Sequence, residues 1–347
     1  MNTVNVAVLG ATGAVGQRFI QLLENHPFLR VAAVIGSDRS AGRTYGEAAR
    51  WVLGGTPPAD VAGMTVLPLD AAPDTPIIFS ALPADIARER ELELAAAGYF
   101  VFSNASAHRM APDVPLLLPE VNLEHLGLIR VQQQKRGWSG ALVTNSNCTV
   151  MPLVMALAPL HRFGITQVNA VSMQAISGAG YPGVASLDIF DNVIPFIPGE
   201  EEKLEAEAKK MLGALDGEEV RPLDALISAS CNRVPVLDGH TVVASVALAE
   251  KPSLDAIRQA WETFRSPEQV ACLPSAPNPP LVVHTLADRP QPRRDRDAGK
   301  GMATSIGRLR ECPVLGYKFV ALAHNTVRGA AGASILNAEL MVTQGYL

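Results

Sequence analysis

The sequence predicts an α/β protein: a Rossmann-type dinucleotide-binding domain plus an α+β substrate domain whose sheet is mixed and mainly antiparallel. A strand-like run at 4–9 leads into a glycine-rich turn and then an amphipathic helix. Strand and helix patterns alternate from there to residue 149, which is typical of a doubly wound parallel sheet. Beyond residue 160 the strand-like runs are short and separated by turn residues, which favours a mixed or antiparallel sheet.

The glycine-rich turn reads Gly-Ala-Thr-Gly-Ala-Val-Gly at 10–16. In such a turn Gly10 allows the tight bend, and Gly13 lets a pyrophosphate approach the backbone at the helix N-terminus. Gly16 lets the helix pack closely on the strand. Because it stands between a strand and a helix, the motif predicts a dinucleotide site. We expect the cofactor to contact this turn at Gly10, Thr12, Gly13, Ala14 and Val15.

The end of the second strand-like run, at 31–35, bears on which cofactor is preferred. The run is followed by Gly-Ser-Asp-Arg-Ser-Ala-Gly at 36–42. Asp38 is placed to bind the ribose 2′-hydroxyl of NAD. Arg39, with the hydroxyls of Ser37 and Ser40, is equally placed to bind the 2′-phosphate of NADP. We favour NADP; the alternative for Arg39 is a solvated loop charge.

Two further strand-like runs, at 76–82 and 99–104, flank an alanine-rich helix at 86–97. Ser80 is expected at the carboxyl edge of its strand, facing the cofactor. Arg109 follows the next strand and is a candidate anion binder, although by itself it reads as a surface charge. The last residues return to this pattern, with a strand at 319–323 and an apolar C-terminal helix. We therefore expect residues 1–149 and 325–347 to form the cofactor domain and residues 150–324 the substrate domain.

Cys148 stands between a strand-like run at 140–143 and an apolar, uncharged segment at 150–158 that reads as a helix. Pro152 falls in the first turn of that helix, where proline is tolerated. At such a junction, free N–H groups and the helix dipole are expected to lower the pKa of the thiol. A thiolate is a strong nucleophile, so the position suits covalent chemistry. The alternative is a buried, inert cysteine.

The second half contains short β-rich runs and two helices. The first run, at 168–176, precedes a flexible loop at 177–183, and later runs lie at 227–236, 241–248, 281–285 and 317–323. Helices are predicted at 200–212, with many charges, and at 253–264, with a buried stripe that includes Trp261. Residues 288–296 carry prolines and mixed charges, which indicates a loop or an oligomer contact.

Composition excludes several function classes. The net charge of −5 and the aromatic content of 5% argue against a nucleic-acid or acidic-membrane surface. The four cysteines, at 148, 231, 272 and 312, form no metal-binding pattern, so no metal site is expected and the compartment should be reducing. No apolar run approaches the roughly 18 residues that span a bilayer, and no signal peptide is recognisable. We expect a cytoplasmic protein.

Several segments together resemble aspartate-β-semialdehyde dehydrogenase in its archaeal and fungal branch. They are the turn at 10–16, Ser-Asn-Cys-Thr at 146–149, Gln-Ala-Ile-Ser-Gly-Ala-Gly-Tyr-Pro-Gly at 174–183 and Arg-Val-Pro-Val-Leu-Asp-Gly-His at 233–240. Asn-Thr-Val-Arg-Gly-Ala-Ala-Gly at 325–332 and Ser-Asn-Ala-Ser-Ala-His-Arg at 103–109 add to them. The resemblance covers essentially the whole chain in order, and the combination is specific although each piece alone is not.

The resemblance implies the NADP-linked interconversion of L-aspartyl-4-phosphate with aspartate semialdehyde and inorganic phosphate. This reaction belongs to the aspartate-family pathway, which leads to lysine, threonine and methionine. The nucleophile would be Cys148, which would form a thioester that accepts hydride more readily than a carboxylate. The resemblance also implies a homodimer, or a tetramer built from dimers, with residues 150–324 as the dimerisation domain.

The resemblance also implies roles for individual residues. His240, which in isolation reads as a turn residue, would be the acid–base residue, and Arg233 would bind the substrate α-carboxylate. Gln174 would orient the substrate or intermediate. Glu200 and Lys203 would hold the α-ammonium and the phosphate, although Glu201 and Glu202 leave that register open. Further donors on the phosphate side would be Arg109 and Asn147, and further cofactor contacts would be Ser177, Gly178, Asn325 and Thr326.

Three other functions stay open. The nearest is another acyl-reducing relative, such as a malonyl-CoA reductase or an N-acetylglutamyl-phosphate reductase; Arg233 and the glutamate run at 200–202 favour an amino-acid substrate. A non-catalytic nucleotide-binding protein is disfavoured by the intact Cys148, His240 and Arg233. A phosphorylating dehydrogenase for sugar phosphates would share the mechanism, but its cysteine-centred motif is not found in this sequence.

Overall fold

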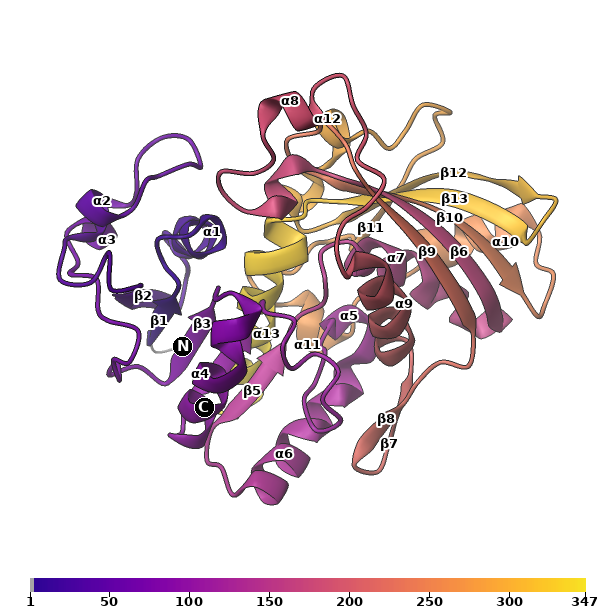
Figure 1. The fold of residues 1–347 in the computed structure, drawn as a ribbon. Helices are drawn as coiled ribbons and strands as arrows, with labels where there is room; N and C mark the ends of the chain where they lie inside the picture. Colours follow the sequence, from indigo (N-terminus) through magenta and orange to yellow (C-terminus); the bar gives the residue numbers. More distant parts are fainter. Residues whose placement is uncertain (1–2) are drawn as a thin grey trace.

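The computed structural model describes residues 3–347 and contains two large sheets (Figure 1). The first sheet is parallel throughout, in the order β2-β1-β3-β4-β5. A further parallel bridge between Ile35 and Leu67 extends it beyond β2, which gives the strand order of a Rossmann sheet. Its strands are β1 (Val4–Leu9), β2 (Leu29–Ile35), β3 (Ile77–Ser80), β4 (Phe100–Ser103) and β5 (Ala141–Thr144).

Helices cover both faces of this sheet, as its buried strands require. Val6 and Val8 of β1 pack in one core with α1 (Ala14–Leu23), α6 (Leu128–Arg136) and α13 (Gly332–Thr343). The alternate residues of the same strand, Ala7 and Leu9, pack in another core with α4 (Ala84–Ala96). The C-terminal helix α13 therefore returns to the N-terminal half of the chain, and it lies beside that half in Figure 1.

The second sheet has the order β11-β12-β13-β10-β6-β9. Three of its neighbouring pairs are antiparallel, whereas β11–β12 and β6–β9 are parallel, so the predicted mixed and mainly antiparallel sheet is confirmed. Its strands are β6 (Ile165–Gln174), β9 (Leu226–Arg233), β10 (His240–Leu248), β11 (Leu281–Val283), β12 (Thr304–Cys312) and β13 (Gly316–Ala323).

One face of the second sheet carries the core formed with α7 (Val150–Leu157), α9 (Glu200–Met211) and α10 (Leu254–Glu262). On the other face Val171, Val243 and Val320 stay at least partly exposed. The predicted loop at 288–296 contains the short helix α12 (Pro292–Asp295). The remaining elements are α2 (Tyr45–Ala48), α3 (Ala59–Ala62), α5 (Pro119–Asn122), α8 (Ser186–Ile189), α11 (Glu268–Ala271), the hairpin of β7 (Ala214–Asp216) and β8 (Glu219–Arg221), the π-turn η5 (Val327–Ala331), and the 3₁₀ helices η1 (Leu123–Gly127), η2 (Ala158–Phe163), η3 (Ile176–Ala179) and η4 (Ala298–Gly301).

Two observations limit the kinds of site to consider. No helix within residues 3–347 is long and apolar enough to cross a bilayer. The same residues contain no group of three or more His, Cys, Asp or Glu side chains that could hold a metal ion.

Candidate active site

Cys148 lies in the short segment between β5 and α7, where the two sheets meet. The π-turn η5 packs directly on it: a β-carbon at Gly329 would lie 2.6 Å from the β-carbon of Cys148. Such an approach is closer than any real side chain tolerates, so only glycine fits there. The C-terminal part of the chain is thereby held against the cysteine.

Two carboxylates of α9 bind the N-terminus of α7 beside Cys148. Glu207 accepts a hydrogen bond from the backbone N–H of Asn147 (2.7 Å). The Asn147 amide donates to both carboxylate oxygens of Glu200 (3.0 and 2.8 Å), and its own oxygen accepts from the N–H of Thr149 (2.7 Å). The backbone N–H groups of Asn147 and Thr149 at this helix start are therefore already bonded to side chains of the protein.

This arrangement contradicts the expectation that the helix start lowers the pKa of the cysteine. Although the residue keeps some solvent exposure, burial of the Cys148 thiol raises its pKa, and the negative charge of Glu200 raises it further, to about 12. The positive charges of Arg109 and Arg233 act in the opposite direction but are the weaker influence. The expectation was wrong because it considered α7 alone, without the burial of the thiol and without the charge of Glu200 that α9 brings to it.

His240 is the first residue of β10 and is completely buried. Its Nδ1 accepts a hydrogen bond from the backbone N–H of Ala175 (3.0 Å). Its Nε2 has no hydrogen-bond partner among the described residues. Burial, followed by the positive charge of Arg233, lowers the pKa of His240 to about 3, so the ring is neutral near pH 7.

Arg233 ends β9 and lies opposite Gln174 in the parallel pair β6–β9. Its guanidinium is 6% exposed and donates to the carbonyl of Ala175 (2.8 Å). Within residues 3–347 no carboxylate lies within 4 Å of it. Gly178 faces both Arg233 and His240, because a β-carbon there would lie 2.9 Å from Nη1 of Arg233 and 3.0 Å from Nε2 of His240.

Glu200 is the glutamate of the run 200–202 that faces this site. Its carboxylate accepts hydrogen bonds from Gln174 (3.2 Å) and Lys203 (3.0 Å) in addition to Asn147. Glu201 instead accepts from the backbone N–H of Cys231, and Glu202 is exposed. The register that places Glu200 and Lys203 in the site is therefore the one that the geometry supports.

Arg109 is buried and is not the surface charge that its local sequence suggests. Its guanidinium donates to Glu207 (2.9 Å) and to the carbonyl of Asn104 (2.7 Å). Sequence reasoning missed Glu207. A pattern that could have revealed it is the spacing on α9, because Glu200, Lys203 and Glu207 are three and four residues apart and share one helix face.

The glycine turn has the shape that a dinucleotide requires. A β-carbon at Gly10 would lie 2.8 Å from the carbonyl oxygen of Ala81, and one at Gly16 would lie 2.3 Å from the carbonyl oxygen of Gly10. At Gly13 the nearest atom would be 3.4 Å away, so this residue leaves room for a ligand. No acidic residue occupies the first turn of α1, so its N–H groups face no competing carboxylate on their own helix.

The predicted specificity loop divides into exposed and buried side chains. Ser37, Asp38 and Arg39 are exposed at the end of β2. The hydroxyl of Ser40 is buried and donates to the carbonyl of Ser37 (2.8 Å), so its hydrogen is already used inside the loop. The hydroxyl of Ser80, at the carboxyl end of β3, is completely buried and lies near Glu91 on α4.

Asn325 connects the two loops around His240. Its amide donates to the hydroxyl of Ser177 (2.8 Å), and its oxygen accepts from the N–H of Gly239 (2.8 Å), the residue before the histidine. Its side chain therefore holds both loops in place, and Thr326 beside it is partly exposed.

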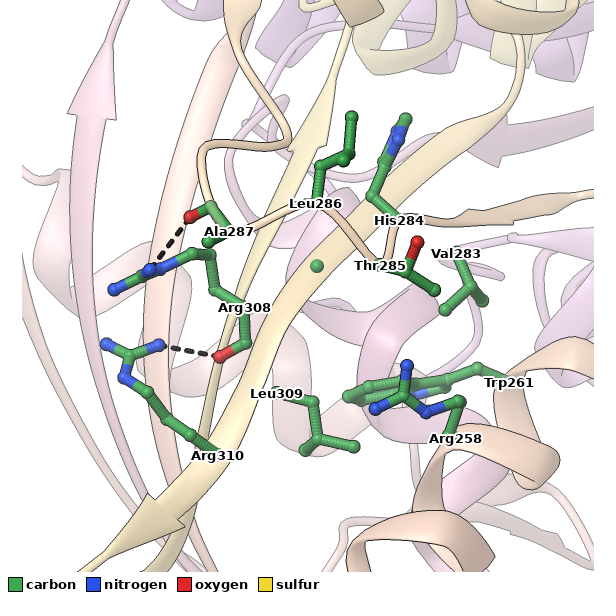
Figure 2. A pocket seen from close by; sticks show the side chains of 11 residues that line it. Arg258, Trp261, Val283, His284, Thr285, Leu286, Ala287, Arg308, Leu309 and Arg310 are labelled. Atoms are coloured by element: carbon green, nitrogen blue, oxygen red, sulfur yellow. Dashed lines mark hydrogen bonds between the residues drawn. The ribbon is translucent and has the colours of Figure 1, made fainter.

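A separate cavity of about 190 Å³ lies between α10 and β12, away from Cys148. Figure 2 shows that the arginines lining it do not converge on one point. Arg308 donates to the carbonyl of Ala287, and Arg310 donates to the carbonyl of Arg308. The cavity therefore offers no assembled anion site.

Comparison with known proteins gives matches along the whole chain. Residues 5–129 match the family model of the semialdehyde dehydrogenase NAD binding domain, and residues 157–328 match that of the semialdehyde dehydrogenase dimerisation domain. An aspartate-semialdehyde dehydrogenase of Archaeoglobus fulgidus is 51% identical, over 98% of both chains. A malonyl CoA reductase (NADP) of Metallosphaera sedula is 38% identical, over 99% of this chain and 98% of its own.

A solved structure agrees with these sequence matches. The crystal structure of an aspartate semialdehyde dehydrogenase with NADP from Candida albicans is 39% identical and superposes with a TM-score of 0.92, with both chains fully covered. Its domains and those of the family models correspond to the two sheets described above. This chain therefore belongs to the aspartate-semialdehyde dehydrogenase family.

Proposed function

We propose that this protein is an NADP-dependent aspartate-semialdehyde dehydrogenase that reduces L-aspartyl-4-phosphate to L-aspartate 4-semialdehyde and releases inorganic phosphate. The observation that carries the proposal is the buried side chain of Arg233, which forms no ion pair within 4 Å with a carboxylate of residues 3–347. A buried cation without a direct ion-pair partner is costly, and a substrate carboxylate would supply that partner in bidentate geometry. Relatives that carry this enzyme's name support the assignment.

In the proposed reaction, the sulfur of Cys148 attacks the acyl carbon, and the carbon–oxygen bond to phosphate breaks. The resulting thioester keeps the acyl group beside Gly178, between Arg233 and His240. Gln174 and Lys203 orient the substrate together with Glu200, which faces the substrate ammonium. Arg109 and Asn147, both tied to α9, support the phosphate side of the site. Bound NADPH supplies the hydride that reduces the thioester.

The proposed cofactor contacts follow from the shape of the first domain. Gly13, Ala14 and Val15 open the ten-residue helix α1 and present backbone N–H groups to the pyrophosphate. Ser37 and Arg39 are the exposed donors available to a 2′-phosphate, which supports NADP over NAD. Gly178 and Thr326 lie where the nicotinamide would meet the acyl group. We propose residues 1–149 and 325–347 as the cofactor domain.

The test is phosphate-dependent reduction of NADP⁺ with aspartate semialdehyde, run beside oxidation of NADPH with malonyl-CoA. We expect turnover in the first assay. Absence of semialdehyde turnover, or faster turnover of malonyl-CoA, would overturn the proposal. Cys148→Ser should lose several orders of magnitude in kcat and still bind NADP. Near-normal activity in that variant would exclude Cys148 as the nucleophile.

We further propose a homodimer formed through the open face of the second sheet, or a tetramer built from two such dimers. Val171, Val243 and Val320 lie directly opposite one another on β6, β10 and β13 and form an apolar row that stays at least partly exposed. The free state of all four cysteines also supports a cytoplasmic location. Val243→Glu should yield a monomer in light scattering, whereas Ile86→Glu on α4, an exposed residue outside this sheet, should not. A dimeric Val243→Glu variant would refute this interface.

A further inference from the structure

One buried lysine joins helix α9, which packs on the second sheet, to a loop that follows β4 of the first sheet. Lys210 lies near the end of α9 and is 5% exposed. Its ammonium donates hydrogen bonds to the backbone carbonyls of Arg109 (2.7 Å), Ala111 (2.8 Å) and Val114 (2.8 Å). An ammonium has three N–H donors, so all of them are used within this loop. The loop at 109–114 is therefore folded around a cation that comes from another part of the chain.

This lysine is held by carbonyl oxygens and not by an ion pair. Two carboxylates, of Asp113 and Glu207, raise its pKa through their charge, but they are bonded to Arg136 and Arg109. Burial has the larger effect and lowers the pKa of Lys210 to about 8, so the group is mostly a cation near pH 7. A buried charge is costly. Its presence here indicates that the geometry of the loop is important.

Arg109 is the residue of this loop that α9 holds at both ends. Its carbonyl accepts from Lys210, and its guanidinium donates to Glu207 (2.9 Å), one turn earlier on the same helix. Because Glu207 and Lys210 are three residues apart, they share one helix face. Nε of Arg109 is buried and has no hydrogen-bond partner among the described residues, so it remains available to an anion. The two contacts together fix the place and the direction of this guanidinium.

The loop has no substitute for the ammonium. Within residues 3–347, the carbonyls of Arg109 and Val114 have no other hydrogen-bond partner. Buried carbonyls without partners are unfavourable, so without Lys210 the backbone of the loop would rearrange. Arg109 would move with it, and a displacement of about 1 Å is enough to weaken a positioned contact strongly.

We propose that Lys210 is a positioning residue for phosphate: it holds the backbone of Arg109 so that the guanidinium meets the phosphate group of the substrate, or inorganic phosphate in the reverse direction. This inference rests on the proposed function. Lys210 does not bind the phosphate itself, because the loop uses its three protons. Its loss should therefore act on phosphate affinity and spare the binding of semialdehyde and NADP.

Steady-state kinetics of phosphate-dependent NADP⁺ reduction give the first test, with each substrate varied in turn. In Lys210→Met, which has a similar length and no donor, we expect the KM for phosphate to rise roughly tenfold or more. The KM for semialdehyde and for NADP should change less than twofold. A purely structural role would reduce the amount of active enzyme, which lowers kcat and leaves every KM unchanged, and that result would overturn the proposal. Lys209→Met, a partly exposed neighbour on α9, is the control and should match wild type.

A double-mutant cycle shows whether Lys210 acts through Arg109. Arg109→Ala should by itself raise the KM for phosphate. Adding Lys210→Met to Arg109→Ala should then change this KM less than about twofold, because the group that Lys210 positions is already gone. If the two effects on the KM instead multiplied, Lys210 would act independently of Arg109 and the proposal would be wrong.

A third measurement uses the wild-type protein with inorganic phosphate, so it applies even if Lys210→Met does not fold. By linkage, a contact that favours phosphate binding is itself favoured by bound phosphate. We expect saturating phosphate to slow amide hydrogen exchange in peptides covering 105–114 and 204–212, and to leave peptides from β12 unchanged. If calorimetry shows bound phosphate and exchange in the loop stays the same, the positioning role is refuted. If wild type neither binds phosphate nor shows phosphate-dependent turnover, the proposed function fails, and this inference fails with it.

Discussion

The carboxylate of Glu207 lies 2.7 Å from the backbone nitrogen of Asn147, one residue before Cys148. The same carboxylate binds the guanidinium of Arg109 over 2.9 Å. One side chain of α9 thus fixes both the segment that carries the nucleophile and the arginine assigned to the phosphate side. Glu200, two turns earlier on the helix, fixes the side chain of Asn147. The second domain therefore shapes the cysteine segment of the first.

Replacing Glu207 should harm both stability and catalysis. Glu207→Gln leaves Arg109 buried without its counter-charge, and losing one partner of a buried pair costs about 3–5 kcal/mol. We expect a lower midpoint in thermal or urea unfolding and a lower kcat. The KM for NADP should stay nearly unchanged, because the hydrogen bonds of Glu207 go to Asn147 and Arg109 and not to the cofactor turn. Glu202→Gln, at an exposed position of the same helix, is the control. Equal stability of the two variants would contradict the role of Glu207.

Glu91 should make stability fall as pH rises. This residue of α4 is completely buried and accepts a hydrogen bond from Ser103 (2.7 Å). Burial raises the pKa of Glu91 from its ordinary value of 4.5 to about 7. The folded state therefore binds this proton more tightly than the unfolded state does. Protonated Glu91 therefore contributes to the free energy of unfolding an amount on the order of 3 kcal/mol. This contribution is fully present below pH 4.5 and is lost as pH rises through about 7.

The variant Glu91→Gln removes this pH dependence of stability, because the amide has a similar shape and stays neutral at every pH tested. We expect its melting temperature to exceed that of wild type at pH 8 and to match it at pH 5. Glu89→Gln, exposed on the same helix, should follow wild type at both pH values. If the melting temperature of wild type instead rose relative to that of Glu91→Gln between pH 5 and pH 8, the prediction would be wrong.

Arg39 should discriminate between the two nicotinamide cofactors. It is exposed at the end of β2, and a charged hydrogen bond to a 2′-phosphate is worth about 1.5–3 kcal/mol. Arg39→Ala should therefore raise the KM for NADP roughly tenfold to a hundredfold and leave the KM for NAD unchanged. Arg43→Ala serves as the control, because Arg43 is exposed nearby and donates to the carbonyl of Glu47. Equal KM values for NADP in wild type and Arg39→Ala would show that Arg39 does not bind the 2′-phosphate of NADP.

Local patterns predicted the fold well because the first sheet depends on them. The turn at 10–16 is specified by the close approach of Gly10 to Ala81, and the alternating faces of β1 follow from its buried residues. Strand β12 was not predicted. A register shift between Gly307 and Arg310 interrupts the period-two alternation that marks a strand, and Arg308 there has a positive φ of 59°.

The functional groups of the site were largely predictable as residue types, but their contacts were not. Cys148, Arg233 and His240 follow from motifs, whereas Glu207 acts through a docking of α9 that joins residues 60 positions apart. The predicted direction of the thiol pKa was wrong for the same reason. A helix N-terminus is a local feature, but the burial of the thiol and the charge of Glu200 depend on packing between segments far apart in the chain. The hydrogen bond that His240 accepts from Ala175 likewise joins residues 65 positions apart.

The charge of Glu200 should hold the pKa of Cys148 above the value that burial alone would give. In Glu200→Gln the pKa of the thiol should fall, so alkylation of Cys148 at pH 8 should become faster than in wild type. The amide oxygen can still accept from Asn147, whereas the amide nitrogen is a donor and cannot replace the second carboxylate oxygen. Catalysis should nevertheless fall, because Lys203 loses its partner and the substrate ammonium loses its carboxylate.

This separation of reactivity from turnover is the decisive feature of the Glu200→Gln variant. A role limited to packing would leave the alkylation rate unchanged, and a role as the base for Cys148 would make alkylation slower. Glu202→Gln, two residues away but exposed, should match wild type in both measurements. Because Glu202 belongs to the same glutamate run, the pair of variants also tests the register of α9. A faster-reacting thiol in Glu202→Gln and not in Glu200→Gln would shift the assignment to Glu202.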